Sequence, residues 1–324
     1  MIIVTGAAGF IGSCLVKRLN HDGFNAIIAV DKFDSPSKTP NLASARIQQL
    51  VDRDNFFTWL DTNYELVEFI FHMGARTDTT EFNKSIFDKL NVEYSKEIWK
   101  RCVKYQIPLV YASSAATYGL GEFGYSDRDD AESLKQLKPL NPYGWSKLEF
   151  DQWAVSQPEK PFYWAGLKFF NVYGPNEYHK GRMASVVWHA YQQILSSDKV
   201  RLFRSHRADV KDGEQMRDFI YVRDVTEVCM YLMEHRKGSG IYNLGSGAAR
   251  TFLDLGSAVF SVLGKKQNVE FIDTPADIRD KYQYFTEADM NKLRGAGYTR
   301  PFTTLEAGIS DYIINYLAKG PGYF

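Results

Sequence analysis

The sequence predicts an α/β fold, in which a doubly wound parallel sheet is followed by a smaller C-terminal α/β lobe that we expect to bind substrate. Three observations predict it. Short apolar runs alternate with helical patterns over residues 1–170, as in parallel sheets whose connections are helices. The first run leads directly into a glycine-rich turn, and the regular alternation stops after residue 175. We therefore expect one domain from residues 1–172 and about 217–245, and a second from about 173–216 and 246–324.

Length and composition exclude several classes of function. The chain has 324 residues, and its 39 Lys and Arg balance its 39 Asp and Glu, so no net field attracts nucleic acid or an anionic membrane. No segment approaches the roughly 20 apolar residues that span a bilayer. Cys14, Cys102 and Cys229 are too few and too scattered for a disulfide framework or a zinc site. We expect an unprocessed cytoplasmic protein with no metal, nucleic-acid or membrane partner.

A glycine turn follows the first predicted strand. Residues 2–4 are β-branched, Gly6, Gly9 and Gly12 are spaced three apart, and residues 13–20 carry apolar side chains at helical spacing. This order is typical of the Rossmann dinucleotide-binding fold, because the backbone N–H groups of the turn and the positive end of the helix face a pyrophosphate. We therefore expect residues 1–172 to begin a dinucleotide-binding domain.

The second strand bears on the choice of cofactor. Residues 26–30 form an apolar run that ends at Asp31, where an acid accepts hydrogen bonds from the adenosine ribose. A simple turn residue is the alternative for Asp31. Lys32, Lys38 and Arg53 follow, and these cations could bind a 2′-phosphate that Asp31 would repel. The choice between NADP and NAD stays open on these residues.

Two further strands end at candidate ligand loops. Residues 66–72 form a buried strand, and residues 107–112 form another that ends at Ser113 and Ser114. Ligands of such sheets lie at these carboxyl ends, although ordinary strand capping also explains the two serines. Residues 82–105 read as one long helix bearing Asn91, and residues 120–138 as a surface loop. The loop after the first of these strands consists of Met73, Gly74, Ala75, Arg76 and Thr77.

Tyr143 and Lys147 form the pair around which the chemistry is organised. If the segment after Pro142 is helical, their side chains project from one face about one turn apart. A nearby cation favours the phenolate, so we expect Lys147 to lower the pKa of Tyr143 and make it usable as a base. A solvated surface pair is the alternative.

The remaining chain has a less regular pattern. Residues 162–169 form a strand, 184–195 a helix, and 204–216 a charged loop without periodicity. Residues 217–222 and 240–244 look like strands that rejoin the sheet. The tail predicts helices over residues 252–263, 286–295 and 303–317 and a strand over 269–272.

Taken together, these motifs resemble the extended short-chain dehydrogenase/reductase family. The marks are the glycine turn, the strand end at Ser114, and Tyr143 with Lys147. Within that family the chain is similar to the epimerases that act on carbon 6 of an ADP-heptose, through its runs at 112–119, 169–175, 179–185, 217–219 and 282–286. The run His179-Lys180-Gly181 with Met183 is the most discriminating of these.

The resemblance implies roles for individual residues. Tyr143 would be one acid/base, Lys147 would lower its pKa and hold the nicotinamide ribose, and Ser114 would bond the reacting oxygen. Lys180 would be a second acid/base on the opposite face of the substrate, although a phosphate contact or a solvated lysine explains it equally well. The implied cofactor residues are Gly6, Gly9, Phe10, Ile11, Gly12, Asp31, Lys32, Lys38, Arg53, Met73, Gly74, Ala75, Arg76, Thr77, Asn91, Lys147, Val172 and Lys180. The implied substrate residues are Ser114, Asn171, Arg182, His189, Phe203, Arg204, Ser205, His206, Arg217 and Tyr282. The chain departs from the family at Arg182, where other members have Ser, and in the longer segment 204–216.

The implied reaction converts ADP-D-glycero-D-manno-heptose into its L-glycero epimer through a transient 6-keto sugar. Its setting is the supply of lipopolysaccharide core precursors. NADP is the implied cofactor, with NAD as the alternative. The implied partners are an ADP-heptose-type nucleotide sugar and other copies of the chain in a homo-oligomer, with a pentamer expected.

Three other functions are compatible with a fold of this kind. A UDP-hexose 4-epimerase is the nearest. A 4,6-dehydratase is disfavoured because Ala115 and Ala116 stand where that chemistry needs an acid pair. A non-catalytic dinucleotide-binding sensor would have no reason to keep Ser114, Tyr143 and Lys147 together.

Overall fold

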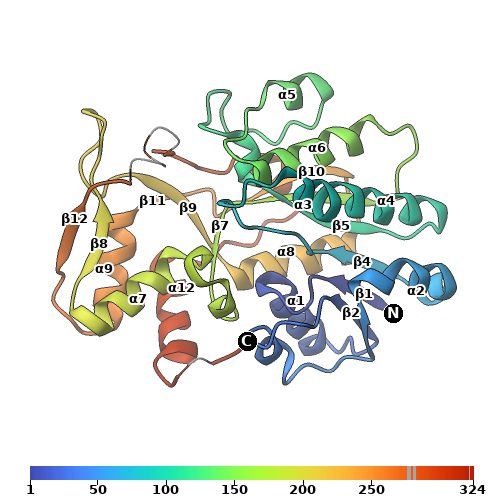
Figure 1. The fold of residues 1–324 in the computed structure, drawn as a ribbon, viewed down its shortest axis with the longest axis horizontal. Coiled ribbons are helices and arrows are strands. Elements are labelled where there is room, and N and C mark those ends of the chain that lie inside the picture. Colours follow the sequence, from blue (N-terminus) through green and yellow to red (C-terminus); the bar gives the residue numbers. More distant parts are fainter. Residues whose placement is uncertain (276–278, 280–281, 321) are drawn as a thin grey trace.

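A parallel sheet forms the larger part of the molecule (Figure 1). The structure is a computed structural model that describes residues 1–275, 279, 282–320 and 322–324. Among these residues the sheet has seven strands, and neighbours run in the order β10-β6-β5-β4-β1-β2-β3. They are β1 (Ile2–Thr5), β2 (Ile27–Asp31), β3 (Gln49–Asp52), β4 (Phe69–His72), β5 (Leu109–Ser114), β6 (Trp164–Phe169) and β10 (Gly240–Leu244). The strand order reverses between β1 and β4, which puts a ligand crevice at their carboxyl ends.

Helices cover both faces of this sheet. In Figure 1, α1 and α8 lie on one face, and α3, α4 and α6 lie on the other. The helices of this half are α1 (Phe10–His21), α2 (Phe56–Asn63), α3 (Lys84–Phe87), α4 (Tyr94–Lys104), α5 (Ala131–Gln136), α6 (Pro142–Ser156) and α8 (Val222–His235). The doubly wound sheet predicted from the sequence is therefore confirmed.

The smaller lobe contains two further sheets. Strands β11 (Ala249–Thr251), β9 (Met216–Tyr221) and β7 (Asn171–Tyr173) form one, and β8 (Val200–Phe203) pairs with β12 (Val269–Ile272) in the other. Its helices are α7 (Val186–Ser197), α9 (Phe252–Val262) and α12 (Leu305–Tyr312), whereas α11 (Asn291–Gly295) packs against β10 and contributes Leu293 to the larger core. Figure 1 shows α7, α9 and α12 beside one another at the end of the molecule away from β1 to β3.

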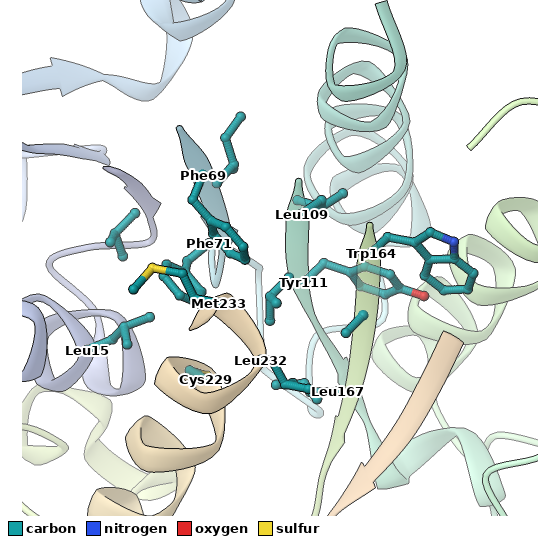
Figure 2. Packing of buried hydrophobic residues seen from close by; sticks show 14 of the residues in the cluster. Leu15, Phe69, Phe71, Leu109, Tyr111, Trp164, Leu167, Cys229, Leu232 and Met233 are labelled. Atoms are coloured by element: carbon teal, nitrogen blue, oxygen red, sulfur yellow. The ribbon is translucent and has the colours of Figure 1, made fainter. Parts of the chain in front are cut away.

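Each half has its own hydrophobic core. The larger core joins the seven-stranded sheet to its helices, and Figure 2 shows Cys229, Leu232 and Met233 of α8 facing the strands. On the sheet, Tyr111 of β5 and Trp164 of β6 stack with ring centroids 6.4 Å apart. The second core lies among the helices and strands of the smaller lobe. Burial of both apolar sets is the main stabilising contribution to this arrangement.

Several predicted elements need correction. Residues 217–222 do not rejoin the parallel sheet, because β9 pairs with β7 and β11 instead; residues 240–244 do join it, as β10. The strand Gln49–Asp52 was not predicted, and residues 120–138 contain α5. The helix expected over 286–295 covers only Asn291–Gly295. The proposed division of the chain into two domains stays a prediction.

Candidate functional site

A cavity of about 370 Å³ lies at the carboxyl ends of β1, β2 and β4. Most of the residues predicted to bind cofactor line it. They are Gly6, Gly9, Phe10, Ile11, Gly12, Asp31, Lys38, Arg53, Met73, Gly74, Ala75, Arg76, Thr77 and Lys180. Four predicted cofactor residues, Lys32, Asn91, Lys147 and Val172, are not part of this lining.

The glycine turn is packed so closely that side chains would not fit. Gly6 has φ +64°, and a Cβ there would lie 2.6 Å from the Gly74 Cα. A Cβ on Gly12 would lie 2.2 Å from the Gly6 carbonyl oxygen. Gly9 caps the N-terminus of α1, whose first turn carries no acidic residue. The positive end of the helix therefore faces the cavity, as binding of a pyrophosphate requires.

The ribose end of the cavity combines an acid with two cations. Asp31 accepts hydrogen bonds from the Ala8 and Lys32 backbone N–H groups at 3.0 and 2.7 Å. The Lys38 Nζ lies 3.4 Å from its carboxylate. Arg53 also lines this end of the cavity; its buried Nε makes no hydrogen bond within the described residues and lies 3.6 Å from the Asp54 carboxylate, so it can still bind an anionic ligand. A nicotinamide dinucleotide therefore fits the residues present here.

Lys32 is directed away from this cavity. Its ammonium pairs with Asp52 and Asp54 at 3.3 and 2.9 Å. The two lysines that follow Asp31 therefore differ in direction, because Asp52 at the end of β3 and Asp54 just after it bind Lys32. Of these two lysines, Lys38 is the one that lines the cavity beside Asp31.

Asn91 holds the backbone of the loop over residues 73–77, which lines the cavity. Its side chain is buried, its Oδ1 accepts from the Arg76 N–H at 2.8 Å, and its Nδ2 donates to the Arg76 carbonyl at 3.0 Å. The same Nδ2 donates to the Ser146 Oγ at 2.9 Å, which joins the loop to α6. Asn91 lies in a π-helical segment, Asp88–Glu93, so the long helix predicted over 82–105 is locally widened and underwound between α3 and α4. In this structure its role is to hold the loop.

Helix α6 presents Tyr143 and Lys147 beside the end of β5. Asn141 caps the helix by accepting from the Gly144 N–H at 2.8 Å, and Pro142 occupies its first turn. The two side chains stand one turn apart, and the Lys147 Nζ donates to the Ala112 carbonyl at 2.8 Å. The Tyr143 phenol lies close enough to the Ser114 side chain for Ser114 to lower its pKa. The structure thus brings Ser114, Tyr143 and Lys147 together.

The pKa values in this pair differ from the sequence-based expectation. Burial raises the pKa of the Tyr143 phenol, and the hydrogen bond with Ser114 opposes this only in part. Burial also lowers the pKa of Lys147 to about 8. The expected lowering of the Tyr143 pKa by Lys147 is therefore wrong as the net direction, because desolvation of the phenol and the Asp151 charge raise this pKa, and Lys147 is not among the groups that lower it.

Lys180 lies on a 3₁₀ helix, Tyr178–Met183, that closes one side of the cavity. Its Nζ stands over the Phe10 ring, 5.5 Å from the centroid, and burial lowers its pKa while the Glu177 charge opposes this. The buried Glu177 carboxylate fixes the turn by accepting from the Ser185 Oγ at 2.7 Å and from the Gly174 N–H at 3.3 Å. Lys180 is thus held near the glycine turn, where it can serve a phosphate as well as a proton.

Three predicted substrate residues gather in the smaller lobe. The Arg217 guanidinium is buried between aromatic rings, 5.5 Å from the Phe252 centroid and 5.3 Å from the Tyr282 centroid. Phe203 contacts Tyr282 edge to face at 5.9 Å. The described residues place no carboxylate on Arg217, whose side chain donates instead to the Met216 and Gln283 carbonyls. A buried cation without an acidic partner suits a phosphate group.

The other predicted substrate residues lie around the edges of the site. Arg204 pairs with Asp212 at 3.3 Å, and the backbone N–H groups of Ser205 and His206 donate to Asp212 and to the Tyr284 hydroxyl. Arg182 is exposed, and its carbonyl oxygen lies 3.3 Å from the Nε2 of His189 in the following helix, α7. Asn171 is exposed and Val172 half-buried in β7, which leads out of the sheet toward the lobe.

Sequence reasoning missed several residues that line the cavity. These are Thr5, Val30, Asp78, Leu90, Tyr94, His179 and Met183. Two of them could have been found, because His179 precedes Lys180 and Tyr94 stands one helical turn after Asn91. Burial and the nearby Lys38 and Lys180 lower the pKa of His179 to about 4, so it is neutral at physiological pH.

Two kinds of feature are absent from the described residues. In that part of the chain no helix is long and apolar enough to cross a membrane. The same residues contain no group of three or more His, Cys, Asp and Glu side chains that could hold a metal ion.

Comparison with known proteins identifies relatives along the whole chain. Residues 2–245 match the model of the NAD dependent epimerase/dehydratase family. The chain is 47% identical over 331 residues to the ADP-L-glycero-D-manno-heptose-6-epimerase of Fusobacterium nucleatum subsp. nucleatum, covering 100% of both proteins. The crystal structure of the Helicobacter pylori ADP-L-glycero-D-manno-heptose-6-epimerase superimposes with a TM-score of 0.79 at 29% identity, covering 97% of this chain and 95% of that one. The Thermotoga maritima UDP-glucose 4-epimerase with UDP-glucose gives a TM-score of 0.76 at 25% identity, with 98% of each chain covered.

Proposed function

The chain belongs to the NAD dependent epimerase/dehydratase family, and from this premise we propose that it inverts carbon 6 of ADP-D-glycero-D-manno-heptose to give ADP-L-glycero-D-manno-heptose. The observation that carries the proposal is the 47% identity to the Fusobacterium nucleatum enzyme, which extends over the entire chain. The smaller lobe, which we infer to hold the sugar nucleotide, is included in that identity. The product serves the supply of lipopolysaccharide core precursors.

The proposed reaction has to invert a carbon that nothing activates. Carbon 6 bears a hydroxyl group and is not adjacent to a carbonyl, so direct loss of its C–H proton is inaccessible. Inversion is easier through a transient 6-keto sugar. A nicotinamide dinucleotide, when bound, supplies the acceptance and return of a hydride. The residues of the chain have to move the hydroxyl proton and hold the ketone oxygen.

Tyr143 and Ser114 are the groups that we assign to the ketone oxygen. The raised pKa of Tyr143 keeps the phenol protonated at neutral pH, so it is ready to donate its proton to the ketone oxygen in the reduction step. In the oxidation step the hydroxyl proton goes instead to the neutral amine of Lys180, and Ser114 bonds the same oxygen. The Lys147 ammonium, tied to the Ala112 carbonyl, provides the positive charge beside them.

Lys180 is the second acid/base in this proposal. The two hydride transfers occur on opposite faces of carbon 6, so a second proton partner on the other side suits the chemistry. Burial lowers the pKa of Lys180, which makes its neutral amine more accessible. Arg217, buried and free of any described carboxylate, is the residue that we assign to the diphosphate of the substrate.

We propose NADP as the cofactor, with Lys38 and Arg53 on the 2′-phosphate and Asp31 on the ribose. The Lys38→Ala and Arg53→Ala variants should each weaken NADP binding by about 10- to 100-fold, because a hydrogen bond to a charged group contributes about 1.5–3 kcal/mol. NAD binding should change little. Dissociation constants for both dinucleotides measure this, and Lys32→Ala, whose ammonium is held by Asp52 and Asp54, is the matched control. If these variants lose the same affinity for NADP and for NAD, Lys38 and Arg53 do not bind a 2′-phosphate, and NAD would be assigned as the cofactor.

The assembly proposed for the chain is a homo-oligomer, with a pentamer expected from its resemblance to the heptose epimerases. The division into a dinucleotide-binding domain and a substrate lobe is proposed on the same ground. Native mass spectrometry of the purified protein measures the number of copies.

The substrate is tested by turnover with purified protein. We expect ADP-D-glycero-D-manno-heptose to be converted and UDP-glucose and UDP-galactose to be left unchanged. Interconversion of the two UDP-hexoses at a comparable rate would favour the alternative, a UDP-hexose 4-epimerase. Bound dinucleotide with no turnover of either class would favour a non-catalytic sensor.

A further inference from the structure

A fully buried ion pair lies directly behind the Tyr143 and Lys147 site. Asp151 of α6 and Lys168 of β6 are 2.9 Å apart, and the side chains of both have no exposed surface. Asp151 stands one helical turn after Lys147 and two turns after Tyr143 on the same helix. We propose that Asp151 and Lys168 are a positioning pair, which holds the end of β5 against α6 and sets the local charge that Tyr143 and Lys147 experience. This inference rests on the proposed function of that site.

The Asp151 carboxylate gathers donors from β5 and β6. Its Oδ1 accepts from the Tyr111 hydroxyl at 3.0 Å, and its Oδ2 accepts from the Ser113 hydroxyl at 2.7 Å and from the Lys168 ammonium. Ser113 and Lys168 are paired residues in the β5–β6 register, so the Asp151 carboxylate binds neighbouring residues of both strands. The carboxylate therefore joins α6 to the part of the sheet that carries Ser114.

Lys168 extends this link to Ser114 itself. Its Nζ donates to the Thr117 Oγ1 at 2.7 Å, and that hydroxyl donates to the Ser114 carbonyl at 2.8 Å. The ammonium also lies over the Tyr118 ring, 5.0 Å from its centroid. A chain of direct contacts thus runs from Asp151 on the catalytic helix to the backbone of Ser114. Movement of either charged group would therefore shift the Ser114 backbone and, with it, the Ser114 side chain that influences Tyr143.

Gly166 makes room for this network. It pairs with Tyr111 across β5 and β6, and a Cβ at Gly166 would lie 2.3 Å from the Tyr111 ring. Any side chain at that position would push the ring aside and withdraw its hydroxyl from Asp151. The Tyr111 hydrogen bond to Asp151 therefore requires glycine at position 166.

The pair also controls the charge around the acid/base groups. The Asp151 charge raises the pKa of both Tyr143 and Lys147, and the Lys168 ammonium at 2.9 Å offsets that charge. Other charged or titratable groups also face this region. From the sheet they are His72 of β4, Tyr111 of β5 and Lys168 of β6, and from α6 they are Tyr143 and Lys147. The connecting segments contribute Tyr118, Asp127, Asp129 and Asp289. Stability alone does not account for such a pair, because buried ion pairs are often no better than apolar replacements.

The experiment titrates Tyr143 directly by NMR of isotope-labelled tyrosine in the holoenzyme, with Tyr143→Phe identifying the signal. Lys168→Met leaves the Asp151 charge unopposed, so the titration midpoint of Tyr143 should rise by about one pH unit or more. Asp151→Asn leaves the Lys168 charge unopposed, so the midpoint should fall by a similar amount. The pH dependence of kcat should move in the same two directions. Lost packing cannot produce shifts of opposite sign.

Two further variants serve as controls. Tyr111→Phe removes one hydrogen bond to Asp151 and keeps both charges, so the titration midpoint of Tyr143 should not move. Lys168→Arg keeps the positive charge that Lys168→Met removes, so its Tyr143 midpoint should equal that of the wild type. If a single charge variant fails to fold, the double variant Asp151→Asn/Lys168→Met removes both charges and should fold with at least about tenfold lower kcat. Unchanged or parallel midpoints, or a double variant with wild-type turnover, would overturn the inference. Because the NMR titration needs no substrate, a wild-type protein that fails to turn over ADP-heptose would count against the proposed function alone.

Discussion

Replacing Tyr143 with Phe is expected to lower kcat for ADP-heptose epimerisation by about 10²–10⁴-fold, the usual contribution of a positioned acid/base. Phe removes only the hydroxyl oxygen, so the packing of the ring against Phe87, at 6.5 Å between centroids, should persist. Because Tyr143 does not line the dinucleotide cavity, the content of bound cofactor should be unchanged. Steady-state kinetics and the nucleotide released on denaturation measure both quantities.

The matched control for that variant is Trp145→Phe, on the same helix. Trp145 is exposed and lies outside the contacts of Ser114 and Lys147. Its loss should leave both kcat and cofactor content within a few fold of wild type. If Tyr143→Phe retains near-normal turnover, the phenol is not the proton carrier and the site must be reassigned.

Replacing Lys180 with Ala should reduce kcat by a comparable factor, about 10²–10⁴-fold, if it is the second acid/base. The same change removes a cation that stands over Phe10 at the mouth of the glycine turn, so some loss of cofactor affinity is also expected. Ala alone cannot separate the two effects. The ratio of kcat to cofactor affinity has to be measured in a variant that keeps the charge.

Lys180→Arg supplies that variant. A guanidinium keeps the positive charge near the pyrophosphate but does not release a proton near neutral pH. Cofactor binding should therefore recover while kcat stays low. Recovery of both would make Lys180 a phosphate contact, and an Ala variant within a few fold of wild type would favour a scheme with Tyr143 as the only base.

The parts of the site that depend on local pattern were predicted from the sequence. The glycine turn follows from spacing between one strand and one helix, and Tyr143 and Lys147 follow from one helical turn. The strand ends at Asp31 and Ser114 follow from apolar runs that stop at a polar residue. Each of these features lies within a short stretch of chain, where period and residue type are sufficient.

The parts that depend on contacts between distant segments were not predicted. Strand β3 escaped prediction because Gln49 and Leu50 are exposed at the edge of the sheet, so no apolar run marks it. The hydrogen bonds from Asn91 to Arg76 and Ser146 join residues 15 and 55 positions apart. The Asp151–Lys168 pair requires the register of β5 and β6. The direction of the Tyr143 pKa likewise depends on burial, which the sequence does not specify.

The central claim is that carbon 6 is inverted by removing a hydride and returning the same hydride to the opposite face. Epimerisation in deuterium oxide, followed by NMR of the product, tests it most directly. The account predicts that the L-glycero product keeps ordinary hydrogen at carbon 6, because that hydrogen never exchanges with solvent. Deuterium at carbon 6 of the product would show that a proton is lost to water, and would contradict the account.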